Sequence, residues 1–176
     1  MIFFLKHEFF KMNTVEKEIF VDVVLSPSDL KYDIKDIVFE KVVSKMKSSA
    51  FEEHGIITDI KKIKSIEHQR ITETSTAIYT VASIIVDCYR PRVSDIIKCK
   101  IRKIFNYGLF FSDKQLRVLI PISTINSDWT LEKMKDDYIL TSKTTNSQLL
   151  TDSEVPIQIQ DVRFEKNGFS CIAKMI

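Results

Sequence analysis

Glycine is scarce in this chain, with three residues among 176. Loops that hold a phosphate group with backbone amides need several closely spaced glycines. The sequence therefore predicts no glycine-rich phosphate loop. Twenty lysines and twenty-five isoleucines outnumber the glycines, a bias typical of AT-rich coding that indicates no particular chemistry.

Cysteine and histidine are also few, and their spacing does not indicate a metal site. The cysteines are far apart and form no Cys-x-x-Cys pair, and no histidine lies at ligand spacing from them. We therefore expect no zinc site, no disulfide framework and no cofactor, with free thiols kept reduced inside a cell. The residues are Cys88, Cys99 and Cys171, with His7, His54 and His68.

Long apolar runs are missing as well. No run approaches the roughly 18 residues that cross a bilayer. The apolar residues 1–5 end at Lys6, and they have neither a preceding basic region nor a small-residue cleavage site. We expect neither a signal peptide nor a membrane partner.

A catalytic group is not evident either. An enzyme needs a nucleophile with its base, a metal cluster or a pair of tuned carboxylates. The adjacent acids at 52–53 and 136–137 lie in polar segments typical of solvated faces, and His54 and His68 have no serine or cysteine at a motif spacing. We expect that the chain is not an enzyme.

Charge is nearly balanced, with 26 basic and 24 acidic residues and a net charge of +2. This excess is too small to indicate a nucleic-acid-binding protein by itself. Residues 93–118 differ, because they form a local basic patch. The patch contains Lys98, Lys100, Arg102, Lys103, Lys114 and Arg117 against Asp95 and Asp113.

The first half of the chain combines strand and helix patterns. Residues 19–25 predict a mostly buried strand, and a turn at 26–29 can cap the helix that follows. Apolar residues then recur every four positions, which predicts one face of a helix. They are Leu30, Ile34, Val38, Val42 and Met46, and Ile37 widens the stripe.

The segments after this helix predict strands. Residues 56–66 place isoleucines between lysines, typical of a strand with an irregular face, and residues 67–75 are polar and turn-rich. Residues 77–86 form a nearly continuous β-branched run, which predicts a central or doubly covered strand. The fold class is therefore α+β, beginning with an antiparallel sheet and a helix. Its apolar faces exceed what a small domain buries alone, which predicts an obligate partner.

A break near Pro91 divides the chain. A proline cannot donate to a sheet ladder, so the strand before it must stop or turn there. We predict two domains, residues 1–92 and 93–176. Arg90 and Arg92 bracket the proline, and we favour a structural role for them at the joint over nucleic-acid binding.

Short strands separated by turns follow the joint. Residues 97–102 alternate between apolar and basic, which places the basic side chains on one face of a strand. Turns are predicted at 106–108 and 112–114, a hairpin at 166–168 and a long polar insert at 126–153. This pattern predicts a small β-barrel such as an OB-fold.

Basic and aromatic residues of the predicted barrel are candidates for RNA binding. Barrels that bind single strands combine a basic groove with aromatic rings on which bases stack. Alternatively, Phe110 and Phe111 are core residues and the lysines form a solvated face; only one of the two rings can point outward from a regular strand. The candidates are Lys98, Lys100, Arg102, Tyr107, Phe110 and Arg117.

The order of these features resembles one protein family. In chain order, the features are an apolar opening strand, a proline-led helix start and a strand that begins at Gly55. An interdomain Tyr-Arg-Pro motif follows, with Ser-Asp-Ile-Ile after it. The last feature is a barrel like that of ribosomal protein S-one. The segments are residues 1–8, 25–37, 55–63, 89–97, 104–111 and 119–125. Together they resemble the stalk subunit of cellular RNA polymerases, which is the seventh subunit of polymerase II, with counterparts in polymerases I and III and in the archaeal enzyme.

The resemblance implies an N-terminal tip domain and a C-terminal OB barrel without an active site. It implies docking on RNA polymerase core subunits near the RNA exit, a heterodimer with a small helical partner (the fourth subunit of polymerase II or its archaeal counterpart), and contacts with nascent single-stranded RNA and initiation factors. The compartment would be the nucleus, or the cytoplasm and virion for a viral protein. The residues assigned to core docking are Gly55, Ile56, Ile57, Gln69 and Arg70, within and before the loop at 67–75.

Several residues depart from the family pattern. An insertion, a tip loop without glycine and replaced residues in the barrel weaken the expectation of tight RNA binding. They suit a diverged lineage such as a large DNA virus that encodes its own polymerase. The alternative function is a free-standing single-stranded RNA-binding OB protein in RNA metabolism or translation. The departures are residues 9–18, residues 68–75, Ser94, Pro121, Gln158 and Gln160.

Overall fold

The computed structural model describes residues 13–176 apart from 48, 72–76, 114 and 135–136. Strands dominate, with one α-helix among the described residues, which confirms the α+β class. These residues form two compact units, 13–90 and 91–176. The expected opening strand at 1–8 lies outside the described part of the chain. No helix within that part is long and apolar enough to cross a membrane.

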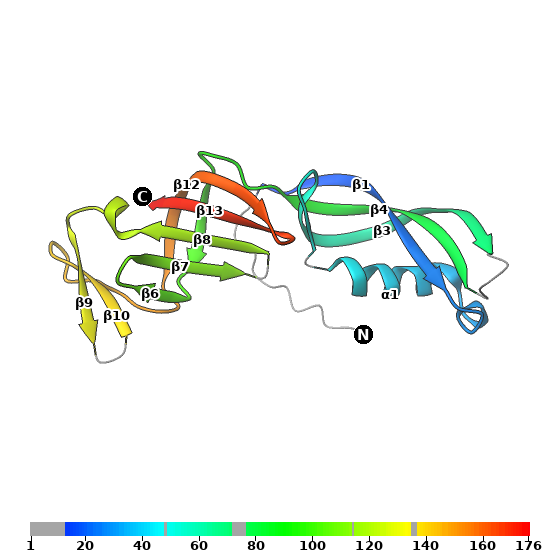
Figure 1. The fold of residues 1–176 in the computed structure, drawn as a ribbon, viewed down its shortest axis with the longest axis horizontal. Helices are drawn as coiled ribbons and strands as arrows, with labels where there is room; N and C mark the ends of the chain where they lie inside the picture. The colour runs from blue at the N-terminus through cyan, green and yellow to red at the C-terminus, as the bar shows by residue number, and fades with distance from the viewer. Residues whose placement is uncertain (1–12, 48, 72–76, 114, 135–136) are drawn as a thin grey trace. The chain divides into compact units, whose positions relative to one another are not determined.

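A four-stranded antiparallel sheet with a helix on one face builds the unit of residues 13–90 (Figure 1). The strand order is β1-β4-β3-β2. β4 is central and pairs with β1 and β3, as its apolar run predicts. The strands are β1 Val15–Leu25, β2 Ala50–Phe51, β3 Gly55–Ile71 and β4 Ile78–Tyr89, and the helices are η1 Asp29–Lys31 (3-10) and α1 Ile34–Met46.

Helix α1 begins later than its apolar stripe suggests. Asp33 is the N-cap, because its side chain accepts a hydrogen bond from a backbone N–H of the first turn at 2.8 Å. Leu30 lies in η1 and is exposed, so the prediction that placed it on the helix is wrong. The rest of the stripe is confirmed, since Val38, Val42 and Met46 are buried in the core.

Strand β3 is repeatedly bulged, which explains its irregular pattern of isoleucines. Its register against β4 shifts at four places. A β-bulge sets two residues of one strand against one residue of its partner. Every third residue of β3 therefore returns to the core, where a regular strand would return every second one. Ile57, Ile60, Ile63 and Ile66 have this spacing, and all contribute to the core.

β3 also continues further than the sequence suggests. The stretch 67–75, predicted to be turn-rich, remains a strand as far as Ile71, because Glu67, Arg70 and Ile71 still pair with β4. One face of an antiparallel sheet can be solvated, so polar residues do not by themselves end a strand. Glu67 and Arg70 are both exposed, so their polar character reflects a solvated side of β3.

The unit of residues 91–176 contains a six-stranded sheet in the order β5-β12-β13-β8-β7-β6 (Figure 1). All neighbours are antiparallel except β13 and β8. The edge strands β5 and β6 are consecutive in the chain, separated only by Ile101 and Arg102, and the sheet is curled. The strands are β5 Ile96–Lys100, β6 Lys103–Phe105, β7 Gly108–Asp113, β8 Leu116–Pro121, β12 Glu154–Glu165 and β13 Gly168–Met175.

Backbone hydrogen bonds extend both neighbouring strand pairings into the junction of β5 and β6. The Ile101 carbonyl accepts from the Asp152 N–H at 2.7 Å, just before β12. The next residue, Arg102, donates its N–H to the carbonyl of Phe110 on β7 at 2.9 Å. The backbone of Ile101 is therefore hydrogen-bonded toward β12, and the backbone of the next residue, Arg102, is hydrogen-bonded to β7.

A turn connects β4 to β5 at the stretch around Pro91, and β4 ends at Tyr89, as the proline predicts. The Asp95 carboxylate accepts from the Arg92 N–H at 3.0 Å, while the Asp95 N–H donates to the Arg92 carbonyl at 3.1 Å. Ser94 has a φ of 75°, in the region that favours glycine. Ser94 therefore has a backbone conformation that glycine usually adopts.

The inner side of the curled sheet is apolar. The alternation predicted for residues 97–102 is confirmed, because the apolar residues are buried and the basic ones exposed. Burial raises the pKa of Cys99 and Cys171 to about 12, so both thiols stay protonated. Both cysteines are free.

The predicted hairpin at 166–168 is confirmed as the connection between β12 and β13. Glu165 pairs with Gly168, and the two residues between them have φ values of 49° and 61°. Two successive positive φ angles are the geometry of a type I′ turn, whose twist matches that of the flanking strands. Asn167, one of these two residues, is of a type that this turn favours, and Gly168 begins β13 directly after it.

The polar insert at 126–153 is folded, which the sequence did not predict. β9, β10 and β11 form a separate three-stranded antiparallel sheet, reached from β8 through the 3-10 helix η2. Ile139 and Leu140 are both buried on β10, so their adjacent positions hide the alternation of a strand. The bounds are η2 Ile122–Thr124, β9 Trp129–Met134, β10 Asp137–Ser142 and β11 Gln148–Leu149.

Candidate nucleic-acid interface

Three aromatic rings gather at the outer side of β6, β7 and the turn between them. Phe105 and Tyr107 stack with 5.0 Å between ring centroids and 6° between ring planes. Phe110 meets Phe105 edge-on, at 6.5 Å and 65°. Lys103 places its Nζ 5.2 Å from the centroid of Phe105, a cation–π distance. We call Phe105, Tyr107 and Phe110 the aromatic cluster.

The members of the aromatic cluster differ in what they offer a ligand. Tyr107 is 55 % exposed, and one of its two faces lies against Phe105. Phe110 is half-buried, between the buried Leu109 and Phe111, so it is the one ring of its pair that points outward. Tyr107 therefore offers the most exposed ring of the cluster, and Phe110 contacts Phe105 from the side.

A row of arginines crosses the outer side of the same sheet. Arg163 on β12 pairs with Ser170 on β13, which pairs with Arg117 on β8, which pairs with Ser112 on β7. Paired residues lie side by side on one face of a sheet. Arg102 completes the row, because its Nε donates to the Ser112 carbonyl at 3.4 Å. We call Arg102, Arg117 and Arg163 the arginine row.

Two members of the arginine row are held in place by hydrogen bonds and ion pairs. Nη2 of Arg117 donates to the carbonyl of Glu165 at 3.2 Å. Nε of Arg163 lies 3.3 Å from Oδ2 of Asp161. Each guanidinium has further N–H groups, so these contacts leave donors for a phosphate. The ion pair nevertheless reduces the charge that Arg163 presents.

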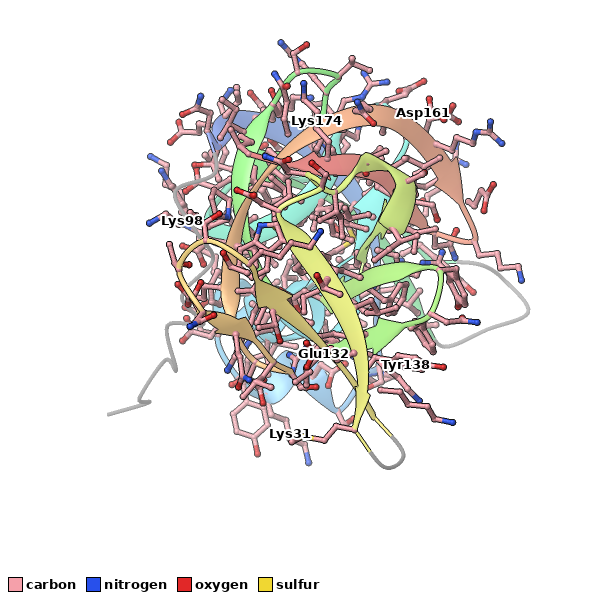
Figure 2. All side chains as sticks on the ribbon, turned by 90° about the vertical axis from the view of Figure 1, so that its left-hand side faces the viewer. Lys31, Lys98, Glu132, Tyr138, Asp161 and Lys174 are labelled. Carbon is pink, nitrogen blue, oxygen red and sulfur yellow. The ribbon has the colours of Figure 1, made fainter. Side chains whose placement is uncertain are left out.

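Lys98 and Lys100 form a second group of basic residues, on β5 at the far end of the strand order. Lys98 lies opposite Pro156 and projects from the outer side of the sheet (Figure 2). Lys100 lies opposite Glu154, and its Nζ is 3.3 Å from Oδ1 of Asp152. Lys98 is therefore the more available charge of this pair.

The structure thus divides the six predicted RNA-binding residues into two groups. Arg102, Tyr107, Phe110 and Arg117 lie on β6–β8 and their connections, and Lys98 and Lys100 lie on β5. Phe105, Lys103 and Arg163 were not among the predicted candidates. Lys103 and Phe105 flank the buried Ile104, so the alternation of a strand places both of them on the outward side. Nothing in the sequence near Arg163 indicates that β12 would lie two strands away from β8.

Gly55, Ile56 and Ile57, which are predicted to dock on the polymerase core, are buried. Ile56 and Ile57 are 3 % and 2 % exposed, so their side chains belong to the chain's own interior. Gly55 has a φ of 96°, and a Cβ there would lie 2.5 Å from the carbonyl oxygen of Tyr89. Only glycine permits this close approach of β3 to the end of β4.

Arg70, another residue predicted to dock on the polymerase core, is exposed. It lies on β3, opposite Tyr79. The side chain of Gln69 and the loop at 72–75 lie outside the described residues. The docking prediction for these positions remains a prediction.

Shifted carboxyl groups in the described chain belong to ion pairs on the surface. The backbone N–H of Ser26 and the ammonium of Lys41 lower the pKa of Asp29 to about 2. Hydrogen bonds from Lys64 and Ser83 lower the pKa of Glu18. Among the residues that the structure describes, no group of three or more His, Cys, Asp or Glu residues could hold a metal ion.

Comparison with known proteins gives no relative, because no family model and no curated protein matches the chain. The features that bear on function are therefore those of the chain itself. They are the aromatic cluster, the arginine row and the order of strands that carries them.

Proposed function

We propose that this protein is a non-catalytic stalk subunit of a DNA-directed RNA polymerase. Residues 91–176 would form an OB barrel that contacts nascent single-stranded RNA. Residues 13–90 would belong to a tip domain that docks on the polymerase core near the RNA exit. The polymerase assignment rests on the ordered resemblance of the sequence, and the RNA contact rests on the surface of the curled sheet.

The strand order carries the OB assignment. β5 and β6 can be counted as one strand that is interrupted at residues 101–102, since they pair with β12 and β7 respectively. The sheet order then begins and ends on the same strand, as in a barrel. β7 and β8 become the second and third strands of this barrel. In OB-folds those two strands present the face that binds oligonucleotides.

The chemistry of that face supports a single-stranded ligand. Rings on which bases stack and basic side chains that follow the backbone are the two elements of such sites, and each stacked base contributes about 1–3 kcal/mol. Tyr107 supplies an exposed ring, and the arginine row supplies the charge. Stacking does not depend on the identity of the base, so the proposed contact has little sequence specificity.

The charge distribution favours a stalk subunit over a free-standing RNA-binding protein. Lys100 and Arg163 are both engaged with aspartates, and the whole chain carries a net charge of only +2. Phosphate contacts provide most of the affinity for RNA and weaken steeply with salt. Modest affinity suits a subunit that the polymerase holds beside the transcript. A free-standing protein would need to bind RNA unaided.

The proposal includes partners and excludes catalysis by this chain. The subunit would pair with a small helical partner and contact core subunits and initiation factors. Nucleotide addition would belong to the large subunits of the complex. The protein would need no cofactor for this role.

Co-purification of the tagged chain from its native source tests the polymerase assignment. Mass spectrometry should identify the large polymerase subunits among the proteins retained at about 0.5 M salt, where exposed charge contacts are screened. A chain that elutes alone, as a stable monomer, would refute the assignment. If such a lone chain also binds RNA tightly at physiological salt and loses that binding on Tyr107→Ala, the alternative function is correct.

A further inference from the structure

A row of apolar side chains runs beside the arginine row on the outer side of the curled sheet. Phe110 on β7 pairs with Leu119 on β8, and Leu119 pairs with Ile172 on β13. Phe110 and Leu119 are half-buried and Ile172 is 40 % exposed, while the residues next to them along each strand face the buried interior. We call Phe110, Leu119 and Ile172 the apolar row.

The two rows lie parallel to each other and cross the strands. On β7, β8 and β13 each residue of the apolar row is two positions from Ser112, Arg117 or Ser170. Two residues of a strand span about 7 Å, and four neighbouring strands span about 14 Å. On β12, Asp161 pairs with Ile172 and Arg163 pairs with Ser170, so both rows end there.

A ligand that contacts both rows must be linear, with apolar groups along one side and anionic groups along the other. A single-stranded nucleic acid has this form, because one sugar separates each phosphate from its base. Arginines bind phosphates through paired N–H groups, and the hydroxyls of Ser112 and Ser170 between them are further donors. Phe110 belongs to both the apolar row and the aromatic cluster, so the surface for bases continues from Tyr107 toward Ile172.

An ion pair closes the two rows at β12. Oδ2 of Asp161 lies 3.3 Å from Nε of Arg163. The carboxylate therefore takes a place at Arg163 that a phosphate of the ligand would also take. Both side chains are exposed, so the pair contributes little to stability. A phosphate can replace the carboxylate, at a cost to the affinity of the ligand.

We propose that a single RNA strand crosses the sheet from β7 to β12, with its bases over the apolar row and its phosphates along the arginine row. Ile172 contacts a base beyond the aromatic cluster, and Asp161 competes with the last phosphate for Arg163. This inference rests on the RNA contact of the proposed function. It adds the path of the strand, one apolar contact and one competing carboxylate.

Photo-crosslinking with the full purified chain maps the path. Two oligouridines of about four nucleotides, the lower limit for one OB-fold, carry a single 4-thiouridine at the 5′ end or at the 3′ end. Mass spectrometry identifies the peptides to which each becomes attached. We expect one end to attach within residues 103–110 and the other within residues 161–172. Attachment of either end to β5 or η2 would mean that the strand takes another path, and would overturn the proposal.

Replacement of Ile172 tests the contact with a base. Ile172→Ser should weaken an oligouridine of about 12 nucleotides about three- to eightfold, because a base would cover the 40 % of the side chain that is exposed. Ile96→Ser is the matched control, since Ile96 is 63 % exposed on β5 of the same sheet but lies opposite Gln158, outside both rows. It should leave affinity unchanged, and circular dichroism should be the same for both variants. Equal affinities of the two variants would overturn the proposal.

Replacement of Asp161 tests the competition for Arg163. Asp161→Asn should tighten RNA binding and steepen the slope of log K against log salt by up to about 0.7, the value for one further phosphate contact. Glu132→Gln controls for net charge, because it removes an exposed carboxylate of β9 outside the rows. Arg163→Gln should weaken the Asp161→Asn protein more than it weakens the wild type. Equal effects of Asp161→Asn and Glu132→Gln would refute the competition.

The wild-type titration separates this inference from the proposed function. If oligouridine does not bind even at about 50 mM salt, the RNA contact and the path are both refuted. If it binds, and Tyr107→Ala weakens it while Ile172→Ser and Ile96→Ser act alike, the path alone is wrong. A peptide of alternating leucine and glutamate is titrated in parallel. Tighter binding of this peptide, lost on Ile172→Ser, would assign the face to an acidic protein segment and overturn the proposal.

Discussion

Replacement of Tyr107 by alanine should weaken RNA binding by removing the main stacking surface of the aromatic cluster. Tyr107 is 55 % exposed, with one face against Phe105 and the other face open to a base. A stacked base contributes about 1–3 kcal/mol, and about 1.4 kcal/mol corresponds to tenfold in affinity. Loss of a complete stack would therefore weaken binding about 5- to 160-fold.

The geometry of the cluster places the expected effect in the lower part of that range. When Tyr107 is removed, the ring face of Phe105 that it covers becomes available to the base. We therefore expect about 5- to 30-fold weaker binding for Tyr107→Ala. The double variant with Phe105→Ala should approach the upper limit, because no parallel ring remains.

The assay is fluorescence anisotropy with a labelled oligouridine of about 12 nucleotides, within the site size of one OB-fold. Titrations at several salt concentrations separate stacking from charge. Tyr107→Ala should change the affinity and leave the slope of log K against log salt unchanged. Arg117→Gln should reduce that slope by about 0.7, the value for one phosphate contact on a single strand.

Tyr32→Ala is the matched control, since it removes an exposed tyrosine from the unit of residues 13–90. If Tyr107→Ala and Tyr32→Ala bind RNA equally well, Tyr107 is not a stacking surface. A decrease in the salt slope for Tyr107→Ala would also contradict the reasoning, because the ring would then act by positioning a charged group.

Three further predictions concern stability and reactivity. Gly55→Ala should lower the free energy of unfolding of residues 13–90 by roughly 2–4 kcal/mol, from backbone strain and the contact with Tyr89; an unchanged urea midpoint would contradict this close approach. Cys99 and Cys171, with pKa values raised by burial to about 12, should resist iodoacetamide at pH 8 in the native protein and react in urea. The folded pKa of Asp29 is about 2 and its ordinary value is 3.8, so its contribution to stability is present above pH 3.8 and is lost as the pH falls toward 2. Asp29→Asn should remove that dependence from acid unfolding curves.

Much of the fold could be predicted because buried and exposed side chains alternate every second residue along a regular strand. The alternation of residues 97–102 identified both faces of β5, and the asparagine and glycine of residues 166–168 identified a turn. The long apolar run of β4 indicated a central strand. Each of these signals is local, so a single sequence contains it completely.

The parts of the fold that the sequence did not predict depend on contacts between distant strands, or have a residue pattern that does not alternate. The bulges of β3 change the core spacing from two to three, which neither a helix nor a regular strand predicts. The burial of both Ile139 and Leu140 hides the strand β10. In the candidate site, the residues that point outward could be predicted from the alternation of apolar and polar residues along each strand. The neutralisation of Lys100 by Asp152 was not, because only the folded sheet brings the two together.

The period of three in β3 has a consequence for the alignment of this strand during folding. A slip of three residues against β4 would keep isoleucine at three of the four core positions, since Ile57, Ile60, Ile63 and Ile66 are equally spaced. The hydrophobic core therefore discriminates poorly between the native register and its neighbours.

Gly55, whose place beside Tyr89 no larger residue can take, opposes such a slip, and charged residues on the outward side oppose it as well. A slip in one direction would put Glu67 where Lys64 now meets Glu18, so that two carboxylates face each other. A slip in the other direction would put Thr58 where Lys61 now meets Glu16 and Asp87, and both ion pairs would be lost. Surface ion pairs contribute little to stability as a rule. In β3 they help, together with Gly55, to specify which of several alignments with a similar core the protein adopts.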